Sequence, residues 1–209
     1  MYLSRLTLDA SRRETLLALA SPSMIHGAVE SAFPGERRRN LWRIDQVDGR
    51  YDLLILSPEK PDLTKAAAQF AAPGETGETK DYSALLDRVQ TGSRWQFRLR
   101  ANPTYSQHTE DGRGRVCAHS TTAHQRAWLL RQSGLHGFSV AEDEFDVTQS
   151  QWYHFSKGIK ERKISLLAVT FEGSLTVTDA GLFCALLLEG IGREKAYGVG
   201  LMTLVSLKE

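Results

Sequence analysis

The segment LWRIDQVDGRYDLLIL, residues 41–56, is the stretch that best indicates the fold. Two runs rich in strand-forming residues, 41–44 and 51–56, flank the dipeptide Asp48-Gly49. This dipeptide tolerates the positive φ angles that a tight hairpin turn requires. The segment therefore predicts two antiparallel strands joined by a short turn.

The sequence on both sides of this hairpin supplies the remaining elements of a small domain. Residues 2–8 favour an opening strand, and residues 11–20 and 21–33 favour two consecutive helices or one kinked helix. After the hairpin, residues 62–70 favour a helix and residues 82–89 a returning strand. The first part of the chain thus has the order β, α, β, β, α, β.

The same order of elements restarts near residue 95. The predicted elements are a strand at 95–100, a helix at 123–132, two strands within 138–177, a helix at 179–189 and a strand at 201–206. Each half matches the split βαβ arrangement called ferredoxin-like, in which both helices cover one face of the sheet. We therefore predict an α+β fold of two tandem ferredoxin-like domains, residues 1–90 and 91–209.

Composition excludes several classes of protein. The 26 Lys and Arg residues nearly balance the 25 Asp and Glu residues, so only a local patch can attract nucleic acid. Cys117 and Cys184 lack the paired spacing of a zinc site or a disulfide framework. With no signal peptide and no apolar run of about 20 residues, we expect a soluble cytoplasmic protein.

His26 is a candidate for proton transfer. It follows Ile25 on a helix whose apolar stripe the neighbouring residues already fill, so its ring lies at the flank of that stripe. Imidazole titrates near neutral pH and can give or take a proton there. Judged by its helical position alone, however, His26 is better explained as a boundary histidine with no chemical role than as a proton-transfer group. Ser23, three residues earlier, can pair with it as a nucleophile, but a serine beside Pro22 is more simply a capping residue.

Residues 190–200, GIGREKAYGVG, are a candidate phosphate-binding loop between a helix and a strand. Glycines let backbone amides approach a phosphate, and Arg193 and Lys195 add charge. The loop is neither a dinucleotide fingerprint nor a P-loop, so we expect no nucleotide cofactor. A helix-to-strand connection that needs positive φ angles explains the glycines equally well.

Basic residues gather in three further places. They are Arg37, Arg38 and Arg39, the strand face formed by Arg94, Gln96, Arg98 and Arg100, and the predicted hairpin tip with Lys157, Lys160, Arg162 and Lys163. A basic hairpin can follow the phosphates of a nucleic acid, although charge runs are also common in solvated loops. The other histidines lack the spacing of metal ligands, so we predict no metal.

Several segments along the whole chain match one known family. They are residues 1–4 (MYLS), 26–34 (HGAVESAFP), 41–43 (LWR), 97–103 (FRLRANP), 127–129 (AWL), 171–173 (FEG) and 190–201 (GIGREKAYGVGL). The chain resembles the CRISPR-associated endoribonuclease of subtype I-E, the CasE family. That family has tandem ferredoxin-like domains, cuts CRISPR repeat hairpins in precursor crRNA and remains a subunit of Cascade.

The resemblance implies roles for particular residues. His26 corresponds to the catalytic histidine, whereas Ser23 stands where family members often carry a tyrosine, so Ser23, Tyr197 or a lysine is left to take that role. The residues expected to bind RNA are Arg98, Arg100, Asn102, Lys157, Lys160, Arg162, Lys163, Gly192, Arg193, Lys195, Gly198 and Gly200. We expect the repeat hairpin and other Cascade subunits as partners, and no membrane or small-molecule cofactor.

The implied reaction needs no metal, because the RNA supplies its own nucleophile. The 2'-hydroxyl attacks the adjacent phosphate and leaves a 2',3'-cyclic phosphate and a 5'-hydroxyl. Two alternatives remain open at this point. One is a catalytically inactive, hairpin-binding subunit of the same complex, and the other is a ferredoxin-like protein-interaction module with no RNA role.

Overall fold

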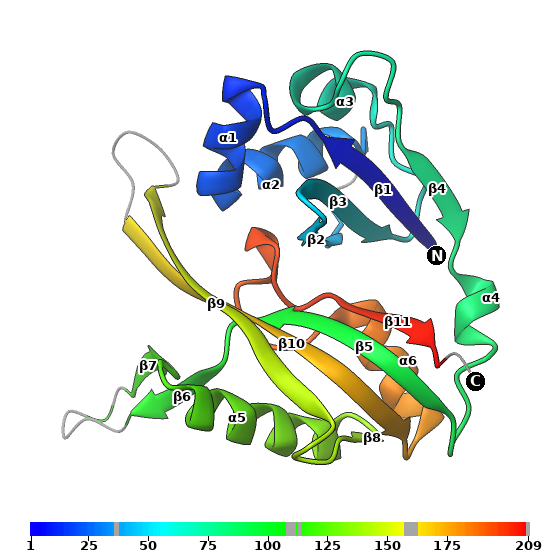
Figure 1. Cartoon of the computed structure of the whole chain (residues 1–209), viewed down its shortest axis with the longest axis vertical. Coiled ribbons are helices and arrows are strands. Elements are labelled where there is room, and N and C mark those ends of the chain that lie inside the picture. The colour runs from blue at the N-terminus through cyan, green and yellow to red at the C-terminus, as the bar shows by residue number, and fades with distance from the viewer. Residues whose placement is uncertain (36–37, 108–111, 113, 157–162, 208–209) are drawn as a thin grey trace. The chain divides into compact units, whose positions relative to one another are not determined.

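The computed structural model describes the chain except residues 36–37, 108–111, 113, 157–162 and 208–209. It divides into two compact units (Figure 1). Unit 1 comprises Met1–Asp87, Tyr153–Ser165 and Lys195–Gly198, and unit 2 comprises Arg88–Trp152, Leu166–Glu194 and Val199–Glu209. The first boundary lies close to the predicted residue 90. The division differs from the predicted one in the two later segments, which group with unit 1.

Unit 1 is built on a four-stranded antiparallel sheet. Its elements are β1 (Tyr2–Leu8), α1 (Arg13–Ala20), α2 (Pro22–Ser31), β2 (Leu41–Val47), β3 (Arg50–Ser57), α3 (Thr64–Phe70), β4 (Glu78–Asp81), α4 (Ser83–Leu86) and the 3-10 helix η1 (Lys195–Tyr197). The sheet order is β2-β3-β1-β4. With β1 and β3 central, this is the predicted split βαβ arrangement.

The hairpin predicted from residues 41–56 is present. Val47 of β2 pairs with Arg50 of β3, which leaves Asp48 and Gly49 as a two-residue turn. Their φ angles are 50° and 77°, the left-handed values that a tight hairpin of this length requires. The turn dipeptide therefore set the register of the two strands.

The strand predicted at residues 82–89 is wrong. The edge strand β4 lies earlier, and its Asp81 carboxylate accepts a hydrogen bond from the Ser83 amide at 2.9 Å. Ser83 then begins the short helix α4, while the Tyr82 amide donates to the Met1 carbonyl. The local Asp-to-Ser turn overrides the strand propensity of the residues that follow it.

Helices α1, α2 and α3 cover one face of the unit 1 sheet (Figure 1). Helix α2 buries Ile25, Ala28 and Val29 at the i, i+3 and i+4 spacing, and these side chains join Leu6 and Leu53 in one apolar core. This core holds α2 against the sheet. The residues of α2 that flank this apolar stripe, among them His26, therefore lie at the edge of the core.

Unit 2 is a second antiparallel sheet with its own helices. Its elements are β5 (Arg94–Ala101), β6 (Thr104–Gln107), β7 (Arg115–Ala118), α5 (Thr122–Leu135), β8 (Phe138–Ser139), β9 (Phe145–Ser156), β10 (Lys163–Val177), α6 (Ala180–Glu189) and β11 (Met202–Ser206), with the ends of β9 and β10 belonging to unit 1. The sheet order is β11-β5-β10-β8, and β9 also pairs with β10. The α+β fold of two ferredoxin-like sheets is confirmed, and the β6–β7 hairpin was not predicted.

The unit 2 core forms on one face of β5, as the alternation of residues 94–100 predicts. Trp95, Phe97 and Leu99 are buried, and Phe171 of β10 lies opposite Leu99. The Trp128 ring of α5 stacks on Phe171 with ring centroids 6.0 Å apart. Within the described part of the chain, no helix is long and apolar enough to cross a membrane.

Candidate functional site

His26 lies on the flank of α2, half-buried, immediately after the fully buried Ile25. The ring of Tyr197 in η1 lies beside it, with ring centroids 6.0 Å apart and ring planes at 67°. This is the edge-to-face geometry of a favourable aromatic pair. The predicted position of the histidine beside the apolar stripe is confirmed. Both residues belong to unit 1.

Tyr197 is enclosed from a second side. Only 7 % of its surface is exposed, and Phe155 of β9 meets its ring edge-on with centroids 4.9 Å apart. The helix η1 that carries Tyr197 lies against α2 and β2. One tyrosine ring therefore touches an imidazole on one side and a phenyl ring on another.

Trp42 of β2 holds the turn that contains Tyr197. Its indole Nε1 donates a hydrogen bond of 3.1 Å to the carbonyl of Ala196. Gly198 has φ 76°, and a Cβ added there would lie 2.5 Å from Cζ3 of the same indole. Ala196 and Gly198, the residues on either side of Tyr197, thus both contact Trp42, and only glycine fits at position 198.

Ser23 lies half-buried one turn before His26 on α2. Its hydroxyl is 3.0 Å from the hydroxyl of Ser21, so one of the two donates to the other. The sequence also favours Ser21, on the other side of Pro22, as a capping residue, and this is wrong because its side chain makes no capping hydrogen bond to the helix. Pro22 still occupies the first helical turn, as a helix start favours.

The predicted RNA-binding residues of the basic hairpin lie only partly within the described chain. Lys163 is exposed at the start of β10, while Lys157, Lys160 and Arg162 lie outside the described residues. In the glycine-rich loop, Arg193 is exposed and Lys195 is half-buried at the start of η1. Lys163 and Lys195 belong to unit 1 together with His26.

The glycines of the loop serve the fold in different ways. Gly192 is exposed with φ 82°, so its backbone is open to a ligand. The Gly200 amide donates a hydrogen bond of 2.6 Å to the Arg100 carbonyl, and the Gly200 carbonyl accepts one from Ile191. The backbone amide and carbonyl of Gly200 are therefore both hydrogen-bonded within unit 2. Glycine is required at position 198 because a side chain there would clash with Trp42.

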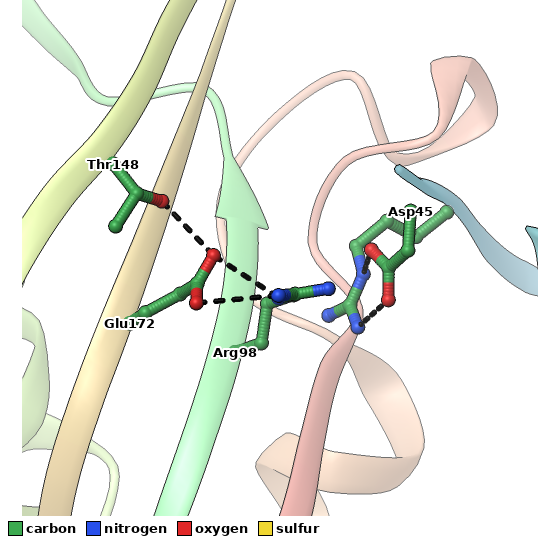
Figure 2. Close-up of polar contacts among 5 residues, drawn as sticks. Asp45, Arg98, Thr148 and Glu172 are labelled. Atoms are coloured by element: carbon green, nitrogen blue, oxygen red, sulfur yellow. Dashed lines mark hydrogen bonds and ion pairs between the residues drawn. The ribbon is translucent and has the colours of Figure 1, made fainter. Parts of the chain in front are cut away.

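The basic face of β5 is partly neutralised by carboxylates of unit 2. Figure 2 shows Arg98 beside Glu172. The Arg98 Nε is 3.1 Å from the Glu172 Oε1. The Thr148 hydroxyl donates to the same carboxylate oxygen at 3.0 Å. Arg94 pairs in the same way with Glu144 at 2.6 Å. Arg98 was predicted to bind RNA, and any RNA contact it makes must compete with this carboxylate.

Arg100 and Asn102 follow Arg98 at the end of β5. Arg100 is half-buried on the same sheet face as Arg98, and Asn102 is 6 % exposed. Within the described residues, the Asn102 Oδ1 is buried with no hydrogen-bond partner. An orphaned buried acceptor is costly, and a donor from a ligand would satisfy it.

Sequence reasoning missed two residues that shape this site, Trp42 and Phe155. Trp42 contacts Ala196, which follows it by 154 positions, and an alternating strand pattern contains no sign of such a partner. Phe155 lies in a segment singled out only for its neighbouring charges. The family resemblance did include Trp42, and that is the one signal that could have pointed to it.

Comparison with known proteins shows which family this chain is similar to. The model of the CRISPR associated protein family matches residues 1–205. The CRISPR-associated endoribonuclease Cse3 of Thermus thermophilus is 29% identical over 225 residues, which cover 98% of this chain and 99% of the relative. The Cascade subunit CasE of Escherichia coli K12 is 36% identical over 184 residues, covering 81% of this chain and 90% of the relative.

Solved structures show the same fold. Cse3 bound to a 19-nucleotide RNA matches with a TM-score of 0.79 at 27% identity, covering 98% of both chains. The crystal structure of Cas6e from Escherichia coli matches with a TM-score of 0.67 at 26% identity, covering 99% of this chain and 100% of the other. The family model matches residues 1–205, and the relatives align over most of the chain. This chain therefore belongs to the CRISPR associated protein family, in the CasE group of subtype I-E.

Proposed function

We propose that this protein is a cytoplasmic endoribonuclease that cleaves CRISPR repeat hairpins in precursor crRNA and stays bound to the product as a Cascade subunit. The observation that carries the proposal is the half-buried His26 imidazole on the flank of α2, beside the enclosed Tyr197 ring. The names of the relatives support it, because one is a CRISPR endoribonuclease and another is a Cascade subunit.

The proposed reaction uses the RNA's own 2'-hydroxyl as the nucleophile. A bond forms between the 2'-oxygen and the scissile phosphorus, and the bond from phosphorus to the 5'-oxygen breaks. The products are a 2',3'-cyclic phosphate and a 5'-hydroxyl. His26 either accepts the proton of the 2'-hydroxyl or donates one to the leaving 5'-oxygen. In this scheme no metal is required.

Binding of the hairpin is proposed to rest on cations and shape. An A-form stem presents phosphates and 2'-hydroxyls instead of a readable major groove, so positive side chains supply most of the affinity. Among the described cationic candidates, Lys163 and Arg193 are exposed, and Lys195, Arg98 and Arg100 are half-buried. Lys157, Lys160 and Arg162, which lie outside the described residues, are proposed as further RNA-binding cations.

An inactive hairpin-binding subunit is the second candidate function. One observation favours it: the family tyrosine is replaced by Ser23, whose hydroxyl is engaged with Ser21. This alternative predicts tight, salt-dependent binding of the hairpin without cleavage at any pH or metal concentration. A protein-interaction module with no RNA role predicts neither binding nor cleavage.

The deciding experiment is a denaturing-gel assay with a labelled repeat hairpin in excess EDTA. Wild type is compared with His26→Ala and with a hairpin that carries a 2'-deoxy nucleotide at the cut. We expect cleavage by wild type alone, with hairpin binding retained in both controls. Cleavage that EDTA abolishes, or full activity in His26→Ala, would refute the mechanism, and binding without cleavage by wild type would establish the inactive subunit.

A further inference from the structure

We propose that Tyr197 is a positioning residue that holds the His26 imidazole in one orientation, and that Trp42 keeps Tyr197 in place. This inference rests on the proposed function for its chemical meaning, but its structural part can be tested in the free protein. All the residues concerned lie in unit 1. Ser23, at the position of the family tyrosine, is engaged with Ser21, so the ring beside His26 comes from a different part of the chain.

The first step is the anchoring of the turn on Trp42. The Trp42 ring is 3 % exposed and belongs to the apolar core of unit 1, so its neighbours restrict its movement. Its Nε1 donates a hydrogen bond of 3.1 Å to the Ala196 carbonyl. Gly198 packs against the six-membered ring of the same indole. With both neighbours fixed, the backbone of Tyr197 has little freedom, and its side chain leaves the turn in a set direction.

The second step is the enclosure of the Tyr197 ring. Phe155 packs edge-on against it at 4.9 Å, which removes alternative rotamers on that side. The ring centroids of Tyr197 and His26 are 6.0 Å apart, and the angle between the ring planes is 67°, the same as for Tyr197 and Phe155. A helix side chain such as His26 has two rotatable bonds, and a rigid ring beside it restricts both.

The third step connects this restriction with catalysis. A proton-transfer group works only when its nitrogen is aimed at the reacting oxygen, and displacement of about 1 Å can cost roughly 100-fold in rate. The packing involves the faces and edges of the Tyr197 ring. We therefore assign the effect to the ring and expect phenylalanine to reproduce it.

The test uses the full chain, with Tyr197→Leu, Tyr197→Phe and a matched control, Tyr105→Leu. Tyr105 also lies beside a histidine, His119, but in unit 2 and with 42 % of its surface exposed. The first readout is the single-turnover cleavage rate with saturating hairpin. We expect a loss of roughly 10- to 100-fold for Tyr197→Leu, rescue to within about threefold by Tyr197→Phe, and no change for Tyr105→Leu. The dissociation constant of the hairpin should change less than about twofold.

The second readout is the proton spectrum of the histidine rings in the free protein. The His26 ring protons should show a ring-current shift in wild type and Tyr197→Phe that Tyr197→Leu abolishes, while the other histidine signals stay in place. Trp42→Phe, which removes the Nε1 donor, should weaken the same shift. If wild type does not cleave, the proposed function fails, and this spectrum still decides whether Tyr197 orients His26.

Three results would overturn the inference. One is a His26 signal that is unchanged in Tyr197→Leu. Another is a Tyr197→Phe variant as slow as Tyr197→Leu, because the hydroxyl would then be the active part. The last is a Tyr197→Leu loss that appears entirely in hairpin affinity, which would make Tyr197 an RNA-binding residue.

Discussion

Each unit contains a tyrosine beside a histidine, and the two pairs differ in how they are held. In unit 1 the His26 and Tyr197 centroids are 6.0 Å apart, and the tyrosine is 7 % exposed. In unit 2 the Tyr105 and His119 centroids are closer, 4.9 Å, but the tyrosine is 42 % exposed. Proximity of the two rings is therefore a poor guide to a site. The enclosure of the tyrosine is what separates the pairs.

The surroundings of the second pair favour the neutral form of its histidine. Burial lowers the pKa of His119, and the nearby His124 and Arg131 lower it further. Within the described residues, its Nε2 is buried with no hydrogen-bond partner. The His119 ring lies beside that of Tyr105 and beside that of His124, whose centroid is 5.7 Å away.

The largest expected difference between the two pairs is in cleavage. His26→Ala should reduce the single-turnover rate roughly 10²- to 10⁴-fold, the usual cost of losing a general acid or base. His119→Ala should leave the rate unchanged. Both variants are measured on the same labelled hairpin with binding measured in parallel. Equal losses in the two variants would show that the enclosed tyrosine does not mark the active histidine.

The next difference concerns the two ion pairs drawn in Figure 2. Arg43 is 1 % exposed and its Nε is 2.6 Å from Asp45, whereas the Arg98 side chain is 29 % exposed beside Glu172. Asp45→Ala should lower the free energy of unfolding by about 3 kcal/mol, because it leaves a buried guanidinium without its carboxylate.

Glu172→Ala is the matched control for this ion pair. It should cost at most about 1 kcal/mol, since solvent screens a half-exposed pair. Urea unfolding followed by circular dichroism measures both changes. A larger effect at Glu172 than at Asp45 would contradict the assignment of burial as the deciding factor.

Two glycines of one loop provide a smaller contrast. An alanine at Gly198 would place its Cβ 2.5 Å from the Trp42 ring, whereas one at Gly192 would lie 3.6 Å from Trp128, an ordinary contact. Gly198→Ala should lower the free energy of unfolding by about 2 kcal/mol or more, from overpacking and a positive φ together.

Gly192→Ala carries only the strain of a positive φ and should cost about 1 kcal/mol. Thermal unfolding of the two variants side by side gives the comparison. If Gly192→Ala were less stable than Gly198→Ala, the packing of the turn against Trp42 would not explain the glycine at position 198.

The smallest effect is the pH dependence that His119 contributes. Its folded-state pKa lies below the ordinary value of 6.5, so the unfolded chain binds the proton more readily. The free energy of unfolding should therefore decrease as the pH falls below about 6.5, and the decrease should end below the folded-state pKa. His119→Gln should remove this part of the pH dependence in urea titrations.

His124→Gln is the control for the cause of that shift. Removal of the His124 ring takes away a neighbour that lowers the pKa of His119, so the pH dependence should become smaller and remain above zero. An unchanged pH dependence in both variants would show that another group is responsible.

Local patterns predicted the elements whose formation depends on nearby residues. The Asp48-Gly49 turn, the apolar stripe of α2 and the alternation along β5 all appear where the sequence indicates them. The strand expected at residues 82–89 failed because a turn from Asp81 to Ser83 begins a helix there. Short segments with mixed propensity are decided by such single contacts.

The candidate site shows where sequence patterns reach their limit. His26 stays a prediction, made from its place on the helix flank together with the family resemblance. The glycine-rich loop was expected to present backbone amides to phosphates, yet the Gly200 amide is engaged with Arg100. Arg98 was expected on an open basic face, and it is paired with Glu172 across the sheet. These partners come from strands and loops far apart in sequence.

The sequence alone indicated the α+β class with two ferredoxin-like halves, the register of the β2–β3 hairpin and the position of His26 beside a buried stripe. The hairpin register and the place of His26 follow from turn chemistry and periodicity within about ten residues, and the two halves follow from the order of such elements along the chain. Only the tertiary structure decided that Tyr197 lies beside His26, that Phe155 encloses it and that Trp42 holds its turn. Those contacts join four separate segments, and packing in three dimensions sets them.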